Sequence, residues 1–362
     1  MLRKYTCTLL AYLCTFGLAY PQNVDTTHNW RTTFSGYIDA YYCFDFAQPK
    51  NNERASYWYN HRRHNEFNVN HGIVKASVTS KNVRGNIALM IGTYSQYNLI
   101  GEQELIRNIY EGNVGFKLSK KANFWLDAGI FASHIGFESA ISKDCWTLLR
   151  SILADNTPYY LSGVKTTYTS PNTKWVLTGL IANGWQRIRR LSNNSMPSFG
   201  TQVQFVPNKH ITLNSSTYIG NEGADSLKQI RLFHNFYGIF NLNDRWGLIA
   251  GFDIGRQGNE LTKQARIWHA AALMLRYKMT AKLTLCGRAE YYKDRKGVFI
   301  PTNTPNGFQT IGYSLNLDYA PAENLLVRFE ARGLSSQDKV LLMNSQAAKQ
   351  NIVLATSIAV SF

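Results

Sequence analysis

The sequence predicts an all-β fold: a transmembrane antiparallel β-barrel of about 16 strands, with short periplasmic turns and long extracellular loops. Three observations predict it. The last segment, 351–362, alternates large apolar side chains with small ones and ends on Phe362, which is typical of a strand with two unlike surroundings. The connections between predicted strands alternate in length. Charged residues recur on one face of the strands.

The amino terminus has the features of a secretory signal peptide. Arg3 and Lys4 precede a short apolar run, and Ala19 ends a small-residue cleavage motif. We expect a signal peptide over 1–19, a periplasmic N-terminal segment over 20–32 and the barrel over 33–362. The net charge of +16 favours anionic lipid headgroups or anionic solutes as partners, and the spread of charge along the strands argues against nucleic acid.

Stretches in which apolar and polar residues alternate recur along the chain and define its strands, and no linker sequence separates domains. The first strand alternates over fourteen residues, more than a usual sandwich strand. The second changes phase near His71 and Gly72, where we expect a β-bulge. The predicted strands are 33–46, 67–79, 83–91, 109–118, 124–131, 159–169, 174–183, 198–205, 211–220, 230–240, 245–255, 267–277, 283–292, 310–319, 325–334 and 351–362.

The predicted connections alternate between seven short turns and eight long polar loops. An even-stranded membrane barrel with both termini in the periplasm requires this alternation, whereas a soluble sandwich does not. The short turns are 80–82, 119–123, 170–173, 206–210, 241–244, 278–282 and 320–324. The long loops are 47–66, 95–108, 132–158, 184–197, 221–229, 256–266, 293–309 and 335–350.

The two faces of the predicted strands differ. Aromatic residues on the outward face gather at the periplasmic strand ends, as an interface girdle requires. They are Phe34, Phe124, Tyr168, Trp175, Phe205, Phe240, Trp246, Tyr277, Tyr319 and Phe362. Charged residues lie on the other face, which must meet water, because Arg or Lys at the bilayer midplane costs about 2–4 kcal/mol. We also expect Tyr110 outward, and His234 falls outward without an explanation.

Four stretches resemble a known family. They are GYIDAYY at 36–42, VRGNIALMIGTY at 83–94, a long run from Trp125 to Tyr168, and KWVLTGLIANGWQRI at 174–188. They resemble the OmpL-like putative beta-barrel porin family of Gram-negative outer membranes. The resemblance implies a barrel in the cell outer membrane with a pore function, and it carries over no defined catalytic or binding residue.

The third long connection, from Ser133 to Tyr159, is the best candidate for a functional segment. It is amphipathic, so we expect it to fold into the lumen and narrow it; the alternative is an extracellular loop packed on its neighbours. We expect Ser142 to cap a short helix there. The candidates for the pore constriction are Glu138, Lys143, Asp144, Arg150 and Asp155 of this segment, with Arg84, Arg231, Arg276, Arg288, Arg328 and Arg332 of the wall.

These features favour a porin that lets small hydrophilic solutes diffuse. Inward bases outnumber inward acids, and rings of basic side chains favour anions, so we expect weak anion selectivity. The alternative is a plugged or narrow barrel with a structural or adhesion role. An outer-membrane enzyme is a third hypothesis, suggested by His134, Glu138, Ser139 and Asp144, but no Gly-x-Ser-x-Gly or HExxH motif supports it.

We expect no cofactor and no metal site. Cys43, Cys145 and Cys286 form no CxxC or Cys/His cluster. The expected partners are outer-membrane lipid, lipopolysaccharide, small hydrophilic solutes and the barrel insertion machinery. Phe362 is the expected assembly signal for that machinery. Arg187, Arg189 and Arg190 at the outer rim suit lipopolysaccharide phosphates; the alternative for them is a solvated loop.

Overall fold

The computed structural model describes residues 30–259 and 264–362. The predicted signal peptide 1–19 and most of the predicted segment 20–32 lie outside the described residues. The first strand begins at Arg31, two residues before its predicted start. No helix in the described part of the chain is long and apolar enough to cross a membrane.

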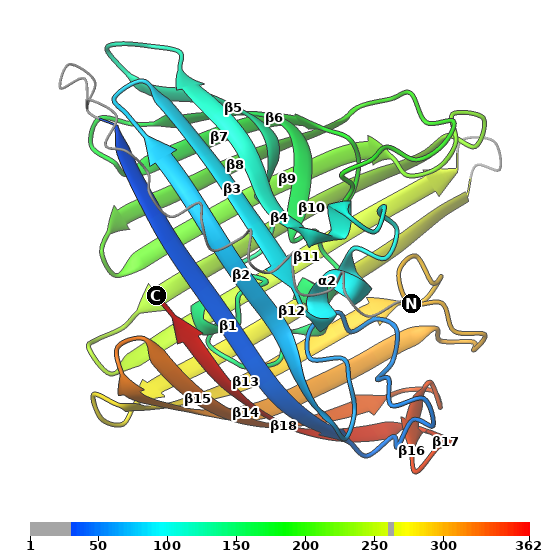
Figure 1. Cartoon of the computed structure of the whole chain (residues 1–362). Helices are drawn as coiled ribbons and strands as arrows, with labels where there is room; N and C mark the ends of the chain where they lie inside the picture. The colour runs from blue at the N-terminus through cyan, green and yellow to red at the C-terminus, as the bar shows by residue number, and fades with distance from the viewer. Residues whose placement is uncertain (1–29, 260–263) are drawn as a thin grey trace, which may run out of the picture.

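Sixteen antiparallel strands close into one barrel, which confirms the predicted fold and strand number. Strand β1 (Arg31–Asp45) pairs on one side with β2 (Phe67–Thr79) and on the other with β18 (Gln350–Ser361), so the first and last strands form the seam (Figure 1). Every other barrel strand pairs with its neighbours in sequence. Closure leaves no strand edge unpaired in lipid.

The remaining elements follow in chain order. The other barrel strands are β3 (Val83–Ile91), β4 (Ile109–Lys117), β5 (Asn123–Ala132), β6 (Tyr160–Thr169), β7 (Trp175–Ala182), β8 (Ser198–Asn208), β9 (Ile211–Asn221), β10 (Gln229–Asn241), β11 (Trp246–Asn259), β12 (Gln264–Lys278), β13 (Leu283–Asp294), β14 (Phe308–Ala322) and β15 (Leu325–Ser336). The connections contain α2 (Thr93–Asn98), η1 (Ile106–Asn108), η2 (Ser142–Asp144), α3 (Ile152–Asp155) and the hairpin β16 (Leu341–Met343) and β17 (Gln346–Ala348).

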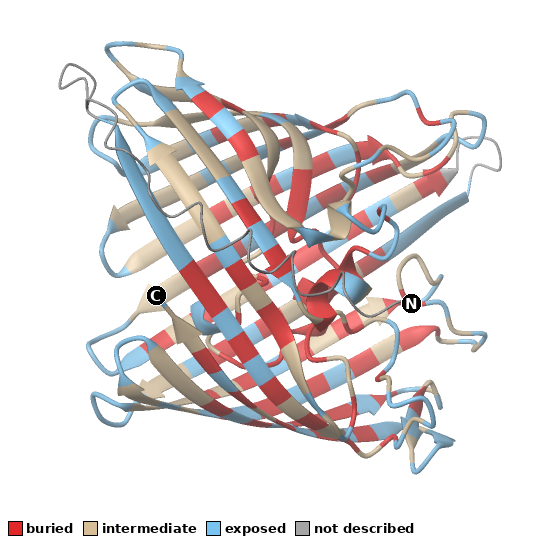
Figure 2. Cartoon of the chain, in the orientation of Figure 1, coloured by how far each residue is buried: buried red, intermediate tan, exposed pale blue. Residues whose placement is uncertain are grey.

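Burial alternates along the strands, as Figure 2 shows. In β18, Ile352, Leu354 and Ile358 are about half exposed, whereas Val353 and Ala355 are buried. Side chains on successive residues of a strand point to opposite faces. The exposed apolar set therefore forms the lipid-facing surface, and the buried set faces a filled lumen.

The predicted aromatic residues pair across strands on the outer face. Trp175 stacks on Phe205, with ring centroids 4.2 Å apart, and the Trp246 and Tyr277 centroids are 4.4 Å apart. Phe362 lies at the seam, where its N–H donates to Gly36 O at 3.0 Å. Its ring covers Gly36 so closely that a Cβ there would lie 2.2 Å from Cζ, so a larger residue at position 36 would displace the ring.

The expected β-bulge in β2 is confirmed, because Asn70 is the extra residue where the register shifts against Asp39 and Ala40. A second bulge was not expected. The register of β3 against β4 shifts between Ala88 and Leu89, and the extra residue in β4 is Tyr110. Its ring packs edge-on against buried His71 at 5.5 Å, so the prediction that Tyr110 faces lipid is wrong.

One predicted long loop is also wrong. Strands β11 and β12 stay paired up to Asn259 and Gln264. The residues expected in the loop 256–266 therefore mostly extend the two strands, because their backbone groups stay paired across the ladder. The connection that remains, 260–263, lies outside the described residues.

Candidate functional site in the barrel lumen

The segment 133–159 lies inside the barrel and contacts opposite walls. On one side, His134 O accepts hydrogen bonds from Gln202 Nε2 at 3.1 Å and Ser216 Oγ at 2.7 Å. On the other side, Leu148 N donates to Asn316 Oδ1 at 2.9 Å, and Ile152 N donates to Glu290 Oε2 at 2.7 Å. All four wall residues face inward, so the segment crosses the lumen as predicted.

Wall arginines hold the backbone of this segment. Arg288 donates to Leu149 O at 2.5 Å, Arg328 donates to Cys145 O at 2.9 Å, and Arg332 donates to Arg150 O at 2.9 Å. These carbonyls belong to irregular backbone, where a buried carbonyl without a partner is costly. A guanidinium group supplies five N–H donors in a fixed fork, which suits this task.

Arg150 does the same from within the segment. Its guanidinium donates to Leu148 O at 2.6 Å and to Ala140 O at 3.0 Å. Arg150, Arg288, Arg328 and Arg332 are each 3% exposed or less. Four of the predicted constriction residues therefore bind the backbone of the lumenal segment, and their guanidinium groups are buried.

Buried carboxylates neutralise these arginines. Glu330 pairs with Arg288 at 2.8 Å, and Glu290 forms ion pairs with Arg332 and Arg288. Glu138 accepts from Ser151 N at 3.1 Å, and burial raises its pKa despite the nearby Arg288. Removing either member of a buried pair leaves an uncompensated charge, so this network should act as one unit.

The last residues of the segment are also buried, because the first extracellular connection packs against them. Burial raises the pKa of Asp155, which accepts from Tyr159 Oη at 2.8 Å and Asn60 Nδ2 at 3.1 Å. Asn60 belongs to the first extracellular connection, and its neighbour His61 lies 2.9 Å from Asp39 Oδ2 of β1. The first connection thus packs over the lumenal segment.

The other predicted residues take no part in this buried ion-pair network, although Arg276 contacts Trp146 of the lumenal segment. Arg84 donates to Asp127 Oδ1 at 2.7 Å, Arg276 stacks on Trp146 at 4.0 Å, and Arg231 lies 3.6 Å from a carboxylate oxygen of Glu222. Lys143 and Asp144 are 3.8 Å apart, with side chains 39% and 50% exposed. Lys143 and Asp144 line a lumenal cavity.

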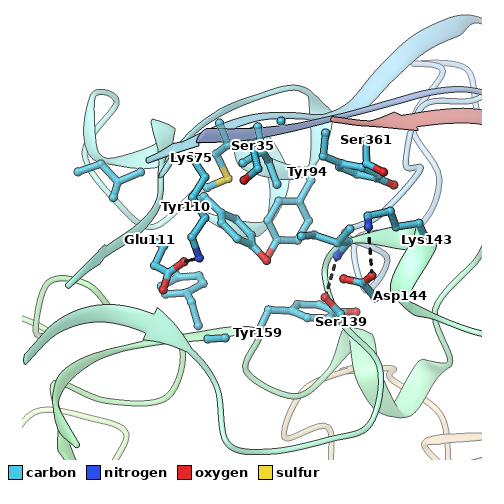
Figure 3. A pocket seen from close by; sticks show the side chains of 18 of the residues that line it. Ser35, Lys75, Tyr94, Tyr110, Glu111, Ser139, Lys143, Asp144, Tyr159 and Ser361 are labelled. Carbon is cyan, nitrogen blue, oxygen red and sulfur yellow. Dashed lines mark hydrogen bonds and ion pairs between the residues drawn. The ribbon is translucent and has the colours of Figure 1, made fainter. Parts of the chain in front are cut away.

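That cavity has a volume of about 600 Å³ and lies between the lumenal segment and β1–β4. Figure 3 shows two ion pairs in its wall, Lys75 with Glu111 and Lys143 with Asp144. Its remaining wall is rich in tyrosine: Tyr37, Tyr94, Tyr110, Tyr159 and Tyr160. The sequence analysis assigned none of these tyrosines to a cavity, and it placed Tyr110 outward. Except for Tyr37 they lie in a loop, at a strand end or at a bulge.

A second cavity of about 250 Å³ lies among the extracellular connections. Asn98, Glu102, Asp155 and Arg187 are among its lining residues. Tyr160 lines both cavities, and its hydroxyl donates to Gln186 O at 3.2 Å. Tyr160 therefore lies where the two water-accessible spaces approach each other.

The expected helix cap is wrong in detail. Ser142 is the first residue of η2, whose N-cap is Ile141. The capping serine is Ser151, whose Oγ accepts from Ala154 N at 3.1 Å before α3. Among the described residues, no group of three or more His, Cys, Asp and Glu could hold a metal ion.

The fold and the lumenal segment define a class, the porins of the outer membrane. The chain belongs to the family described as "Putative beta-barrel porin-2, OmpL-like", whose model matches residues 31–362. The protein is accordingly an outer-membrane porin. A comparison with curated protein sequences gives no match.

Solved structures show the same fold at low identity. The anion-selective porin from Comamonas acidovorans has a TM-score of 0.61 and 9% identity, covering 92% of this chain and 100% of that one. The outer membrane channel DcaP of Acinetobacter baumannii has a TM-score of 0.63 and 9% identity over 92% and 97%. Salmonella typhi OmpF has a TM-score of 0.61 and 9% identity over 91% and 97%.

Proposed function

We propose that this porin passes small hydrophilic solutes along one side of the lumen, past the segment 133–159, and that Tyr160 forms the narrowest point. The observation that carries the proposal is the shared lining: Tyr160 borders both the extracellular cavity and the lumenal cavity. The lumenal segment fills the other side through its buried ion-pair network. Solutes then meet tyrosine hydroxyls and two ion pairs, which suits hydrophilic molecules.

Weak anion selectivity fits the distribution of charge. Lys117, Lys165 and Arg276 face the lumen without a carboxylate partner among the described residues; Lys165 Nζ lies 4.5 Å from the centre of the Phe131 ring. The acids Asp127, Glu290 and Glu330 are paired with arginines. The charge left unpaired among these six residues is positive, which favours anions; Asp253 opposes it as an inward carboxylate without an ion pair in the described residues. The similar porin from Comamonas acidovorans is also anion-selective.

The test is single-channel conductance in planar bilayers. Tyr160→Ala should raise the conductance, because it removes the ring between the two cavities. Tyr313→Ala is the matched control, since Tyr313 is 60% exposed on the lipid-facing side and should leave conductance unchanged. Equal conductance of Tyr160→Ala and the wild type, with normal folding, would place the route elsewhere.

We propose no catalytic role. His134, Glu138 and Ser139 make their hydrogen bonds to different partners: Thr217 O, Ser151 and Ile141 N respectively. Nucleophile and base would have to lie within hydrogen-bond reach of each other. Absence of lipid hydrolysis by the purified protein would agree with this proposal, and hydrolysis lost on His134→Asn would overturn it.

A further inference from the structure

One sector of the lipid-facing surface departs from the apolar pattern. A single row of cross-strand neighbours runs over β8 to β14, and six of its seven members are polar. The row is Thr201, Thr217, His234, Ile254, His269, Lys293 and Gln309. Because the strands are tilted in a barrel, the row climbs from the membrane interior towards the extracellular side.

The lower part of the row is satisfied by the protein itself. The Thr201 and Thr217 hydroxyl oxygens are 2.6 Å apart, and His234 Nε2 lies 2.8 Å from Ser215 Oγ. A polar group in hydrocarbon without a hydrogen bond is costly, and these bonds reduce that cost. They account for the outward His234 without any partner molecule.

The upper part of the row is not satisfied. His269, Lys293 and the adjacent Arg256 face outward near the extracellular ends of β12, β13 and β11. None of the three forms an ion pair with a carboxylate in the described residues. His269 and Lys293 are direct cross-strand neighbours. This level of the barrel meets the headgroups of the outer leaflet, so the cations Arg256 and Lys293 and the imidazole of His269 face an interface where lipid phosphates lie.

A groove connects the two parts. It has a volume of about 530 Å³ and runs over β9–β12 from Arg256 to Thr217 and His234. Its exposed wall is apolar, with Ile219, Leu232, Ile254 and Ile267 each 41–54% exposed. An apolar groove with a cation at its extracellular end has the shape and polarity of one acyl chain with an anionic headgroup.

We propose that this face binds one phosphorylated lipid of the outer leaflet, with an acyl chain in the groove and a phosphate against Arg256, His269 and Lys293. Arginine forks suit phosphate oxygens. A second copy of the chain is the competing occupant; in a two-fold contact this face would meet itself and bring like charges together, which disfavours that association. The proposal does not depend on the solute route.

The test is native mass spectrometry of the delipidated, refolded porin in detergent, titrated with diphosphoryl lipid A or its dephosphorylated form. The test variant is Arg256→Gln/His269→Gln/Lys293→Gln. The matched control, Lys209→Gln/Lys278→Gln/Lys282→Gln, removes three exposed cations at the periplasmic ends of strands. Heat-modifiable mobility checks that every variant folds.

The phosphorylated lipid should bind the test variant roughly 30-fold more weakly, since Arg256 and Lys293 each contribute about 1 kcal/mol near anionic lipid and 1.4 kcal/mol is a factor of ten. The control should match the wild type, and the dephosphorylated lipid should bind as weakly to the wild type as to the test variant. Ile254→Trp should weaken binding by filling the groove. Equal affinity of the test variant and wild type overturns the proposal, as does a change of oligomeric mass with unchanged lipid binding, which would assign the face to contact between copies.

Discussion

Glu290→Gln should release the lumenal segment. Glu290 accepts a hydrogen bond from Ile152 N at 2.7 Å and forms an ion pair with Arg332, whose side chain is 1% exposed. Arg332 has no other carboxylate partner within ion-pair distance in the described part of the chain. Glutamine keeps an acceptor for Ile152 but leaves the buried guanidinium without its counter-charge.

The magnitude follows from burial. Removing one partner of a buried ion pair costs about 3–5 kcal/mol. Because the glutamine side chain would retain one hydrogen bond, we expect the lower end of this range, about 3 kcal/mol. A loss of that size reduces the ratio of docked to released segment by roughly 100-fold. We expect larger conductance, or frequent transitions to a larger conductance, while the barrel remains folded.

The assay is single-channel recording with urea unfolding of the same preparations. Glu53→Gln is the matched control: Glu53 pairs with Arg62 and Arg63, but its side chain is 30% exposed, and exposed pairs contribute only about 0–1 kcal/mol. If Glu290→Gln records the same conductance and unfolding midpoint as Glu53→Gln, the buried network does not hold the segment in the lumen.

Three further predictions follow from the same contacts. Burial lowers the pKa of His61, and lowers that of His134 to about 4; the unfolded state therefore takes up these protons first, and the stability of the lumenal packing should fall as pH drops from about 6.5 towards 4. Burial raises the pKa of Glu138, so this carboxyl group alone would make the packing more stable at low pH. The measurement therefore compares acid unfolding of the wild type with that of His134→Asn. Equal acid sensitivity of the two proteins would contradict a role for His134. Lys143→Glu should shift the reversal potential under a salt gradient towards cations, whereas Lys121→Glu in an exposed periplasmic turn should not; equal shifts would mean that the cavity does not carry the current. Deleting Phe362 should reduce heat-modifiable barrel in the outer membrane if it is the assembly signal, and normal amounts of folded barrel would remove that role.

The sequence predicted the barrel well because strand number depends on local alternation and on loop length, both of which are visible in one chain. It failed where one residue changes the phase. Tyr110 follows the outward pattern of β4 until a bulge turns it against His71. Strand β11 is also longer than predicted, since Arg256 to Asn259 have the composition of a polar loop and yet remain paired with β12.

The lumenal segment could be predicted as amphipathic, but its partners could not. Arg288, Arg328 and Arg332 look alike on an inward face whether they meet water or a folded segment. The distinction depends on contacts between residues more than a hundred positions apart, such as Arg328 with Cys145 O. The excess of inward bases in the sequence was therefore a poor measure of the charge that a solute meets, because several of these arginines are neutralised by carboxylates inside the network.

Residues that violate an otherwise regular pattern carry information that composition does not. His234 is an outward polar residue in β10, and the sequence of that strand alone does not explain it. Strand register turns it into one member of a row with Thr217 and His269. Where the protein supplies a hydrogen bond, as Ser215 does for His234, the exception needs no ligand. Where it supplies none, as for Arg256 and Lys293, the counter-charge that we propose is a phosphate of the outer leaflet.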